Sequence, residues 1–354
     1  MSAEPANRPA AAPAGPASST PAAPPTIIIQ QPGRFLGRAG GWLFTMLLVV
    51  SLLANFTAYT SYQEYFAADA TLNERYHSGD HFAAEKLAII RVSGVIMTPF
   101  SDRVIKTIKT VLDDKNVKGV LLAVDSPGGT VTNSDQIYHE LKKLSETKPV
   151  VVSMGSLAAS GGYFVAMGAG PQGKIFAEPT TWTGSIGVII PHYEVTDVAE
   201  KIGFKAAPLK TGEFKDSLSP FRELTARDKE VWDNILNQSF DLFLTVIDDN
   251  RDKLDKEQVR KLATGQIYTA KDALENGLVD VIGFEDDALE ELKKITGLSK
   301  ARVVTFQHPV ALWESLLGSV KASSDPAAQW KSVLELAVPR AMYYFSGGLP
   351  LPPE

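Results

Sequence analysis

The sequence predicts an α/β domain that follows a single transmembrane helix. Residues 40–59 contain no charged side chain and are dominated by large apolar residues, and about 20 such residues are enough for a helix to cross a bilayer core. From residue 87 onward, short runs of aliphatic residues alternate with segments whose apolar residues recur at helical spacing. That alternation is typical of helices packed on a sheet.

Composition limits the possible functions of the chain. The 354 residues, with 44% hydrophobic and 21% charged side chains, suit one large folded domain or two small ones. A net charge of -6 gives no hint of nucleic-acid binding. The chain has no cysteine, which excludes disulfides, thiolate metal sites and a cysteine nucleophile.

The segments flanking the apolar run predict how the chain meets the membrane. Residues 1–33 are rich in Ala and Pro and are expected to form a disordered segment. The predicted anchor comprises residues 34–62, and a polar linker is expected over 63–84. Arg34 and Arg38 precede the run whereas acidic residues follow it, so the N-terminus is expected in the cytoplasm and the folded domain outside.

A buried core helix and a cleaved signal peptide are the alternatives to a membrane anchor. The run lacks the amphipathic spacing of a core helix. The small-residue sequence Ala68-Asp69-Ala70 lies well beyond the apolar run, and the preceding region is far longer than a signal sequence requires. An uncleaved anchor is therefore favoured.

The folded part is expected to span residues 85–300, followed by a tail, 301–354, to which the pattern assigns no role. Buried strands are predicted at 87–96 (bent, or a pair), 117–124 and 150–154. Shorter strand-like pieces at 266–269 and 279–282 close the domain. A capping box at Thr225 and Asp228 opens a long helix, whose expected inward residues are Trp232, Ile235, Leu236, Phe240, Phe243 and Val246.

Two glycine-rich turns follow two of the predicted strands. The first, Asp125-Ser-Pro-Gly-Gly129, contains a glycine pair whose backbone amides can face an anion. The second, Ala158-Ala-Ser-Gly-Gly-Tyr163, places Ser160 where a strand passes into a helix, and a helix N-terminus favours negative charge. Together the turns predict a nucleophile and an oxyanion hole, although both are also consistent with ordinary tight turns in which Ser160 caps a helix.

A nucleophilic serine needs a base, and the sequence offers two kinds. Among the five histidines, only His139 and His192 are placed where they could complete a Ser-His-Asp triad. The other candidate is Lys215, in a loop bounded by Gly212 and Pro220. Its amine would have to be neutral, which requires burial to lower a reference pKa of about 10.4. Composition and spacing leave this choice open.

Four sequence blocks, in order and in spacing, resemble the signal peptide peptidase A family in its short, single-repeat form. They are Asp125-Ser-Pro-Gly-Gly129, Val152-Ser-Met-Gly-Ser-Leu-Ala-Ala-Ser-Gly-Gly-Tyr163, Thr183-Gly-Ser-Ile-Gly187 and Thr211-Gly-Glu-Phe-Lys-Asp-Ser-Leu-Ser-Pro220. The resemblance covers about residues 87–298. It implies the fold of the ClpP/crotonase superfamily, which is a spiral of strand-strand-helix units.

The resemblance also implies roles for individual residues. Ser160 matches the family's nucleophile, Lys215 its general base, and the turn of Gly128 and Gly129 its oxyanion hole. Ser185 matches the serine that orients the lysine. In the expected mechanism the amides of Gly129 and Ser160 hold the oxyanion, an acyl-enzyme forms, and no metal or organic cofactor is needed.

The expected function is therefore that of a membrane-anchored serine endopeptidase acting on signal-peptide remnants or similar apolar peptides. The resemblance implies a homo-oligomer with shared active sites, in which Lys215 serves Ser160 of a neighbouring subunit. The expected partners are apolar peptides and the membrane, without nucleic acid. Two alternatives are a crotonase-like acyl-CoA enzyme and a catalytically silent membrane scaffold.

Overall fold

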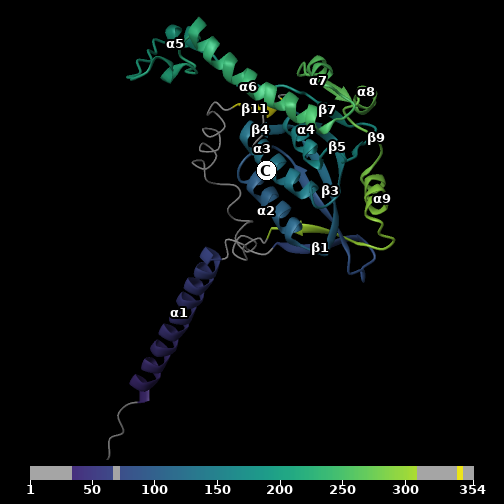
Figure 1. Cartoon of the computed structure of the whole chain (residues 1–354). Coiled ribbons are helices and arrows are strands. Elements are labelled where there is room, and N and C mark those ends of the chain that lie inside the picture. Colours follow the sequence, from purple (N-terminus) through teal and green to yellow (C-terminus); the bar gives the residue numbers. More distant parts are fainter. Residues whose placement is uncertain (1–33, 67–71, 309–340, 346–354) are drawn as a thin grey trace, which may run out of the picture. The chain divides into compact units, whose positions relative to one another are not determined.

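The computed structural model describes residues 34–66, 72–308 and 341–345 (Figure 1). The chain separates into two units, Met1–Asp69 and Ala70–Glu354, and each is described by itself. The disordered segment expected over 1–33 and most of the expected tail lie outside the described residues.

The described part of the first unit is one helix, α1 (Arg34–Phe66). Its stretch Gly40–Tyr59 is long and apolar enough to cross a membrane, as no other helix among the described residues is. Its large side chains are exposed, with Trp42 at 81% and Phe44 at 69%, so this stretch is not a buried core helix. The helix continues to Phe66, beyond the expected end of the anchor at residue 62.

The second unit is built on a mixed sheet whose central strands are parallel. Its path runs β1 (Asn73–Gly79), β10 (Arg302–Gln307), β2 (Lys86–Ser93), β3 (Val117–Ser126), β5 (Val150–Ala159), β6 (Ile175–Ala177) and β9 (Val281–Ile282). A branch consists of β7 (Trp182–Gly184), which pairs with β5, and β8 (Ile267–Thr269), which pairs with β7. The predicted α/β architecture is confirmed.

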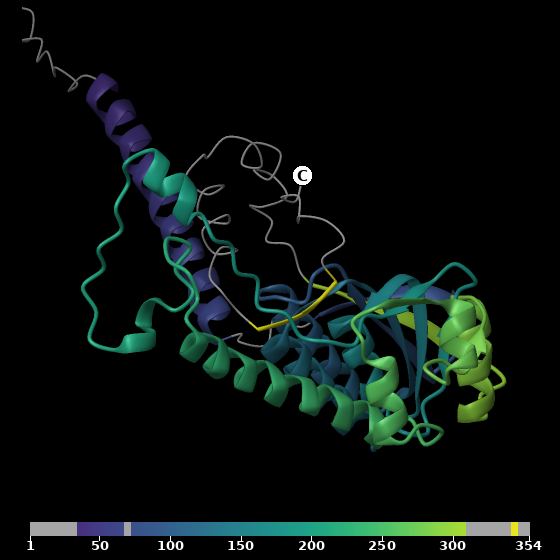
Figure 2. The same ribbon diagram turned by 90° about the horizontal axis from the view of Figure 1, so that it is seen from above.

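Helices cover both faces of this sheet (Figures 1 and 2). Alternate residues of a strand face opposite sides, and in β3 Val120 and Leu122 pack with α2 (Phe100–Asp113), α3 (Val131–Ser145) and α4 (Gly161–Ala166). Leu121 and Ala123 pack against α9 (Glu285–Thr296) on the other face. Burial on both faces explains why these strands appear in the sequence as continuous apolar runs.

The remaining elements connect the layers or lie at their margins. They are β4 (Gly128–Thr130), η1 (Met167–Ala169), α5 (Thr196–Lys201), η2 (Glu213–Asp216), α6 (Ala226–Asn250), α7 (Lys256–Leu262), α8 (Ala270–Glu275) and β11 (Met342–Tyr344). The strand-like pieces predicted near 266–269 and 279–282 correspond to β8 and β9.

The expected boundaries of the folded domain, 85 and 300, are too narrow. Strand β1 lies in the expected linker, and β10 lies in the expected tail, yet β10 is inserted between β1 and β2. Strand β1 is exposed along most of its length, so it lacks the apolar alternation that reveals a strand. Its pairing with β10 joins segments more than 200 residues apart, which local periodicity does not specify.

Helix α6 begins with the predicted capping box of Thr225 and Asp228, but most of its expected inward face is not buried. Phe243 and Val246 are buried, whereas Ile235 is 37% exposed. The other three expected inward residues, Trp232, Leu236 and Phe240, are half-buried. The first half of α6 extends beyond the sheet (Figures 1 and 2), so periodicity identified an apolar face without identifying what covers it.

A buried ion pair fastens the end of α6 to the sheet. The Arg251 guanidinium donates to the Asp280 carboxylate at 2.8 and 2.9 Å, and Asp280 also accepts the Ile175 N–H at 3.0 Å. Although burial disfavours the charged form, the hydrogen bonds and charge of Arg251 outweigh it and lower the pKa of Asp280. The Arg251 side chain is 5% exposed, so its charge depends on this partner.

We expect Asp280→Asn to lower the free energy of unfolding by about 3 kcal/mol, because a buried guanidinium loses its counter-charge. The exposed pair Arg260–Asp241 provides the control, and Asp241→Asn should cost less than about 1 kcal/mol. Urea denaturation of the wild type at several pH values should also show how the ionised Asp280 contributes to the free energy of unfolding. This contribution is fully present above the unfolded pKa of about 3.9 and is lost as pH falls through the lower pKa that Asp280 has in the folded protein. Equal effects of the two substitutions would contradict the assignment.

Candidate functional site

Three parallel strands end at one edge of the sheet and bring their following turns together. Strand β3 pairs with β5 up to Ser126 and Ala158, and β5 pairs with β7 up to Ala159 and Gly184. Residues that follow these pairs therefore lie side by side. This register brings the Gly128–Gly129 turn, Ser160 and Ser185 into one place.

The first turn can be made only with glycines. Gly128 has φ 95°, and a Cβ there would lie 2.0 Å from the Tyr343 carbonyl oxygen and 2.6 Å from the Gly161 nitrogen. A Cβ on Gly129 would lie 2.0 Å from the Ile96 oxygen. The Ser126 hydroxyl fixes the turn by donating to the Gly94 oxygen at 2.6 Å and accepting the Gly128 N–H at 3.1 Å.

Ser160 is held in an unfavourable backbone conformation between β5 and α4. Its φ of 53° is uncommon for a residue with a side chain, and such strain clusters at functional sites. Its side chain is buried, and the hydroxyl has no hydrogen-bond partner among the described residues. It does not cap the helix through its side chain, so the cap interpretation is not supported.

The structure corrects one expected oxyanion donor. The Ser160 N–H already donates to the Gly184 oxygen at 2.7 Å, so it does not point at a substrate. The next amide, that of Gly161, opens helix α4 and lies against Gly128. The first N–H groups of a helix lack intrahelical partners, so the Gly161 amide, rather than that of Ser160, is the candidate donor beside Gly129.

Ser185 lies directly beside Ser160 but Lys215 does not. Ser185 is buried with φ 49°, and its N–H donates to the Gln266 oxygen at 2.7 Å. Lys215 is exposed in η2. Its side chain is in no hydrogen bond or ion pair with the described part of the chain, and since Ser160 also has no partner there, the two do not touch within one chain.

The two histidines considered as bases are no better placed. His139 is exposed on α3. His192 lies beyond β7, and its Nε2 is buried without a partner. Neither ring bonds to the Ser160 hydroxyl.

The C-terminal strand β11 covers this site. It pairs antiparallel with β4, so that Tyr343 lies opposite Gly129. On its other side Met342 exchanges two backbone hydrogen bonds with Ile189, at 2.9 and 3.0 Å. Residues 342–344, from the end of the expected tail, therefore lie as an extended strand between two peptide segments.

The side chain of Tyr343 anchors that strand. It is fully buried and packs against Phe164 and Phe243, with ring centroids 5.0 and 4.6 Å away. Its hydroxyl donates to the Ser239 oxygen at 2.7 Å. A Cβ on Gly128 would lie within 2.6 Å of both the Tyr343 carbonyl oxygen and the Gly161 nitrogen. A peptide carbonyl therefore already occupies the region of the expected oxyanion hole.

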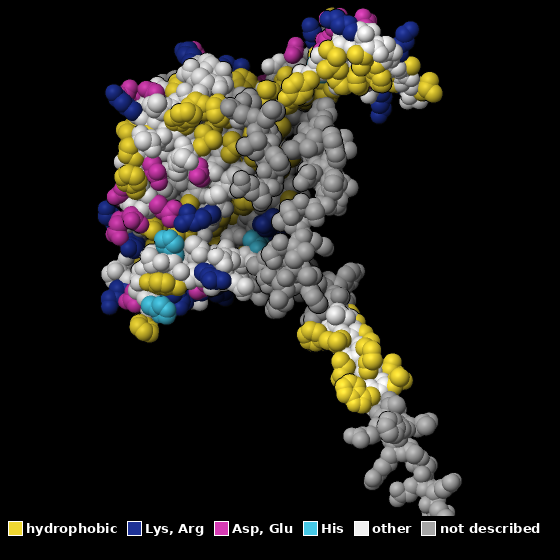
Figure 3. All heavy atoms as spheres, turned by 180° about the vertical axis from the view of Figure 1, so that it is seen from behind, with side chains coloured by type: hydrophobic (Ala, Val, Ile, Leu, Met, Phe, Trp, Pro, Cys, Tyr) yellow, Lys and Arg dark blue, Asp and Glu magenta, His cyan; other side chains and the backbone are white. Residues whose placement is uncertain are grey.

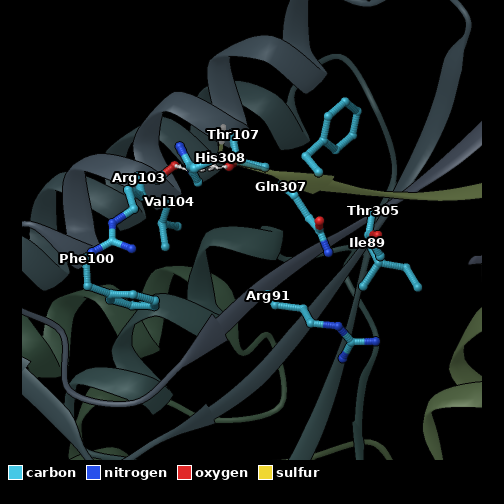
Figure 4. A pocket seen from close by; sticks show the side chains of 10 residues that line it. Ile89, Arg91, Phe100, Arg103, Val104, Thr107, Thr305, Gln307 and His308 are labelled. Carbon is cyan, nitrogen blue, oxygen red and sulfur yellow. Dashed lines mark hydrogen bonds between the residues drawn. The ribbon is translucent and has the colours of Figure 1, made fainter. Parts of the chain in front are cut away.

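A separate cavity of about 300 Å³ lies elsewhere in this unit (Figure 4). It is lined by residues of β2, α2 and β10, together with His308. Arg91 at its rim is paired with Glu285 at 2.8 and 2.9 Å. None of the candidate catalytic residues lines it, and no group of three potential metal-ligating side chains occurs among the described residues.

Comparison with known proteins first defines the class. The family described as Clp protease matches residues 78–199. This range includes the central strands β2, β3 and β5 and the Ser160 turn, so the match agrees with an α/β peptidase. The family described as Peptidase family S49 matches residues 142–299. That match includes the Ser160, Ser185 and Lys215 segments.

Individual relatives extend these matches. A Synechocystis protein named as a protease is 39% identical over 236 residues, covering 66% of this chain and 83% of that protein. An Enterococcus faecium protein named as a signal peptide peptidase is 35% identical over 254 residues, covering 68% and 72%. The chloroplast serine protease SPPA of Arabidopsis thaliana is 32% identical over 250 residues, covering 67% and 36%. The chain belongs to peptidase family S49, a family of serine proteases.

Because β11 lies across the Gly128–Gly129 turn beside Ser160, its removal should make the serine more reactive. We expect a chain lacking residues 341–354 to be labelled several-fold faster by a small fluorophosphonate, measured by intact-protein mass spectrometry. The matched control lacks only residues 346–354 and keeps β11, so its labelling rate should equal that of the full chain. Equal rates in all three proteins would show that β11 does not limit access to Ser160.

Proposed function

We propose that this chain is a membrane-anchored serine endopeptidase that cleaves apolar peptides such as signal-peptide remnants. Ser160 is the nucleophile and Lys215 the general base. The observation that carries the proposal is the buried, strained and unpartnered Ser160 beside the Gly128–Gly129 turn. The Enterococcus faecium relative, named as a signal peptide peptidase, supports the substrate class.

In this mechanism each group has one task. Lys215 takes the proton from the Ser160 hydroxyl as its oxygen attacks the substrate carbonyl carbon. The N–H groups of Gly129 and Gly161 hold the oxyanion, and Ser185 orients the amine. The carbon–nitrogen bond then breaks, Lys215 protonates the leaving amine, and water hydrolyses the acyl-enzyme.

The substrate binds as an added strand. Strand β11 supports this geometry. The residues that flank it bond to Val131 and Pro127 on one side, and Met342 bonds to Ile189 on the other. An extended peptide in the same place would satisfy its backbone groups through the same ladder. A neighbouring aromatic pocket, now filled by Tyr343, fits an apolar side chain of that peptide.

Lys215 reaches Ser160 from a neighbouring subunit. Residues 189–235, which we call the arm, carry a high density of exposed apolar side chains (Figure 3). The most exposed are Tyr193, Val198, Ile202, Phe204 and Leu209. A surface of this kind usually marks a protein or membrane contact, and packing on a second copy would bury both the arm and the Lys215 amine.

Helix α1 supports a membrane location. The exposed apolar stretch Gly40–Tyr59 serves as an uncleaved anchor, with the N-terminus in the cytoplasm and the peptidase unit outside. Protease added to intact cells or spheroplasts should then degrade the peptidase unit while a tag at residue 1 survives.

Point substitutions should separate the base from the alternatives. We expect Ser160→Ala and Lys215→Ala each to lower turnover of a fluorogenic apolar peptide by about 10⁴-fold or more. Ser185→Ala should cost about 10²-fold, because the amine loses its orientation. His139→Ala and His192→Ala serve as controls and should keep most of the activity. Loss of activity in folded His192→Ala would refute the Ser-Lys assignment, and an inactive wild type would favour a silent scaffold.

Mixing two inactive variants tests the shared site. Ser160→Ala subunits keep the lysine and Lys215→Ala subunits keep the serine, so random mixed oligomers should regain about one quarter of the wild-type sites. Turnover should be measured after co-expression with two different tags and tandem purification. Mixed oligomers that form but stay inactive would show that each chain supplies its own base.

A further inference from the structure

The turn that carries Lys215 is held from both sides, whereas no described residue holds the lysine amine. Arg227 donates to the Glu213 carboxylate at 2.8 and 3.0 Å. The Trp232 indole N–H donates to the Ser217 hydroxyl at 3.0 Å. Both donors lie in the first two turns of α6. The Lys215 side chain, by contrast, has no hydrogen bond or ion pair with the described residues, so the turn presents an unengaged amine.

Arg222 is the centre of this arrangement. Its Nε donates to the backbone and carboxylate oxygens of Asp216 at 3.1 and 3.0 Å. Its Nη1 and Nη2 donate to the two carboxylate oxygens of Asp228 at 2.6 and 3.1 Å. One guanidinium therefore joins the residue after Lys215 to the first turn of α6.

Both acidic partners are kept ionised by their surroundings. The Arg222 hydrogen bonds hold the pKa of Asp228 well below its usual range, and Asp228 also accepts the Thr225 N–H and hydroxyl at 2.9 and 2.8 Å. The pKa of Asp216 is lowered by hydrogen bonds from Lys210 and Arg222. Asp228 is buried, so this cluster is more than a loose surface ion pair.

We propose that Arg222 is a positioning residue for peptide hydrolysis, because it fixes the Lys215 turn on α6 and so aims the amine. The inference rests on the proposed role of Lys215 as base. A planar guanidinium bridges two carboxylates at fixed angles, which a lysine ammonium does not. The Lys215 amine has no hydrogen bond or ion pair with the described residues, and its position is therefore set by the backbone that Arg222 holds.

Substitutions of Arg222 should change the chemical step without changing substrate binding. In the full-length oligomer, Arg222→Ala should lower kcat for a fluorogenic peptide by about 10²-fold, with KM unchanged because the proposed strand-binding position beside β4 is intact. Arg222→Lys should fall between Arg222→Ala and the wild type. Arg260→Ala is the matched control, because Arg260 pairs with Asp241 on the exposed side of α6 at 2.6 Å, and it should leave kcat unchanged.

A double substitution tests whether Arg222 acts through the lysine. The readout is the rate at which a fluorophosphonate modifies Ser160, which stays measurable when peptide turnover is lost. Arg222→Ala should slow labelling in the wild-type background but have no further effect in Lys215→Ala, because no amine remains to be aimed.

Three results would overturn the inference. They are an unchanged kcat in Arg222→Ala, an equal slowing of labelling in both backgrounds, and a shift to monomers in size-exclusion chromatography, which would assign Arg222 to assembly. If Lys215→Ala is itself as active as the wild type, the proposed base is wrong, and that failure is distinct from the failure of Arg222.

Discussion

The close approach of backbone to backbone at the ends of β3, β5 and β7 determines the rest of the site. Gly128 faces the Gly161 nitrogen so closely that a Cβ would lie 2.6 Å from it. A Cβ on Gly162 would lie 2.7 Å from the Ser126 oxygen. Since no side chain fits between these turns, amide groups and the Ser160 hydroxyl are the polar groups that meet there. A site for a peptide oxyanion needs such a cluster of fixed dipoles.

The same constraint explains which parts of the site the sequence could predict. The Gly128–Gly129 turn and Ser160 each follow a buried apolar strand closely, and parallel neighbours end at the same edge of a sheet. Local signals therefore predicted that the two turns lie together, although they did not distinguish a nucleophilic serine from a helix cap. The base was different, because spacing alone left His139, His192 and Lys215 open and only the resemblance of four blocks chose among them.

Features that depend on register or on distant pairing were beyond the sequence pattern. The Ser160 N–H donates to Gly184, and only the pairing of β5 with β7 reveals that this amide is already engaged. Strands β1 and β10 were assigned to a linker and a tail because neither has a clear alternation. Strand β11 is a short piece of that tail. Its position beside Gly129 depends on the packing of the Tyr343 ring against Phe164 and Phe243, which are distant in the sequence.

The two halves of the proposed dyad are held in opposite environments. Ser160 is buried beside the turn on which β11 lies, whereas Lys215 is exposed in η2, a turn held on the first half of α6. A lysine amine acts as a base only when neutral, and burial is the main physical means of favouring that form. Within a single chain neither requirement is met, because the serine is closed to a peptide and the lysine is open to water. Under the proposed mechanism a substrate strand must displace β11 and a second copy must bury the arm, so two separate binding events together create the nucleophile. Such a dependence would keep a strained serine inactive until both partners are present.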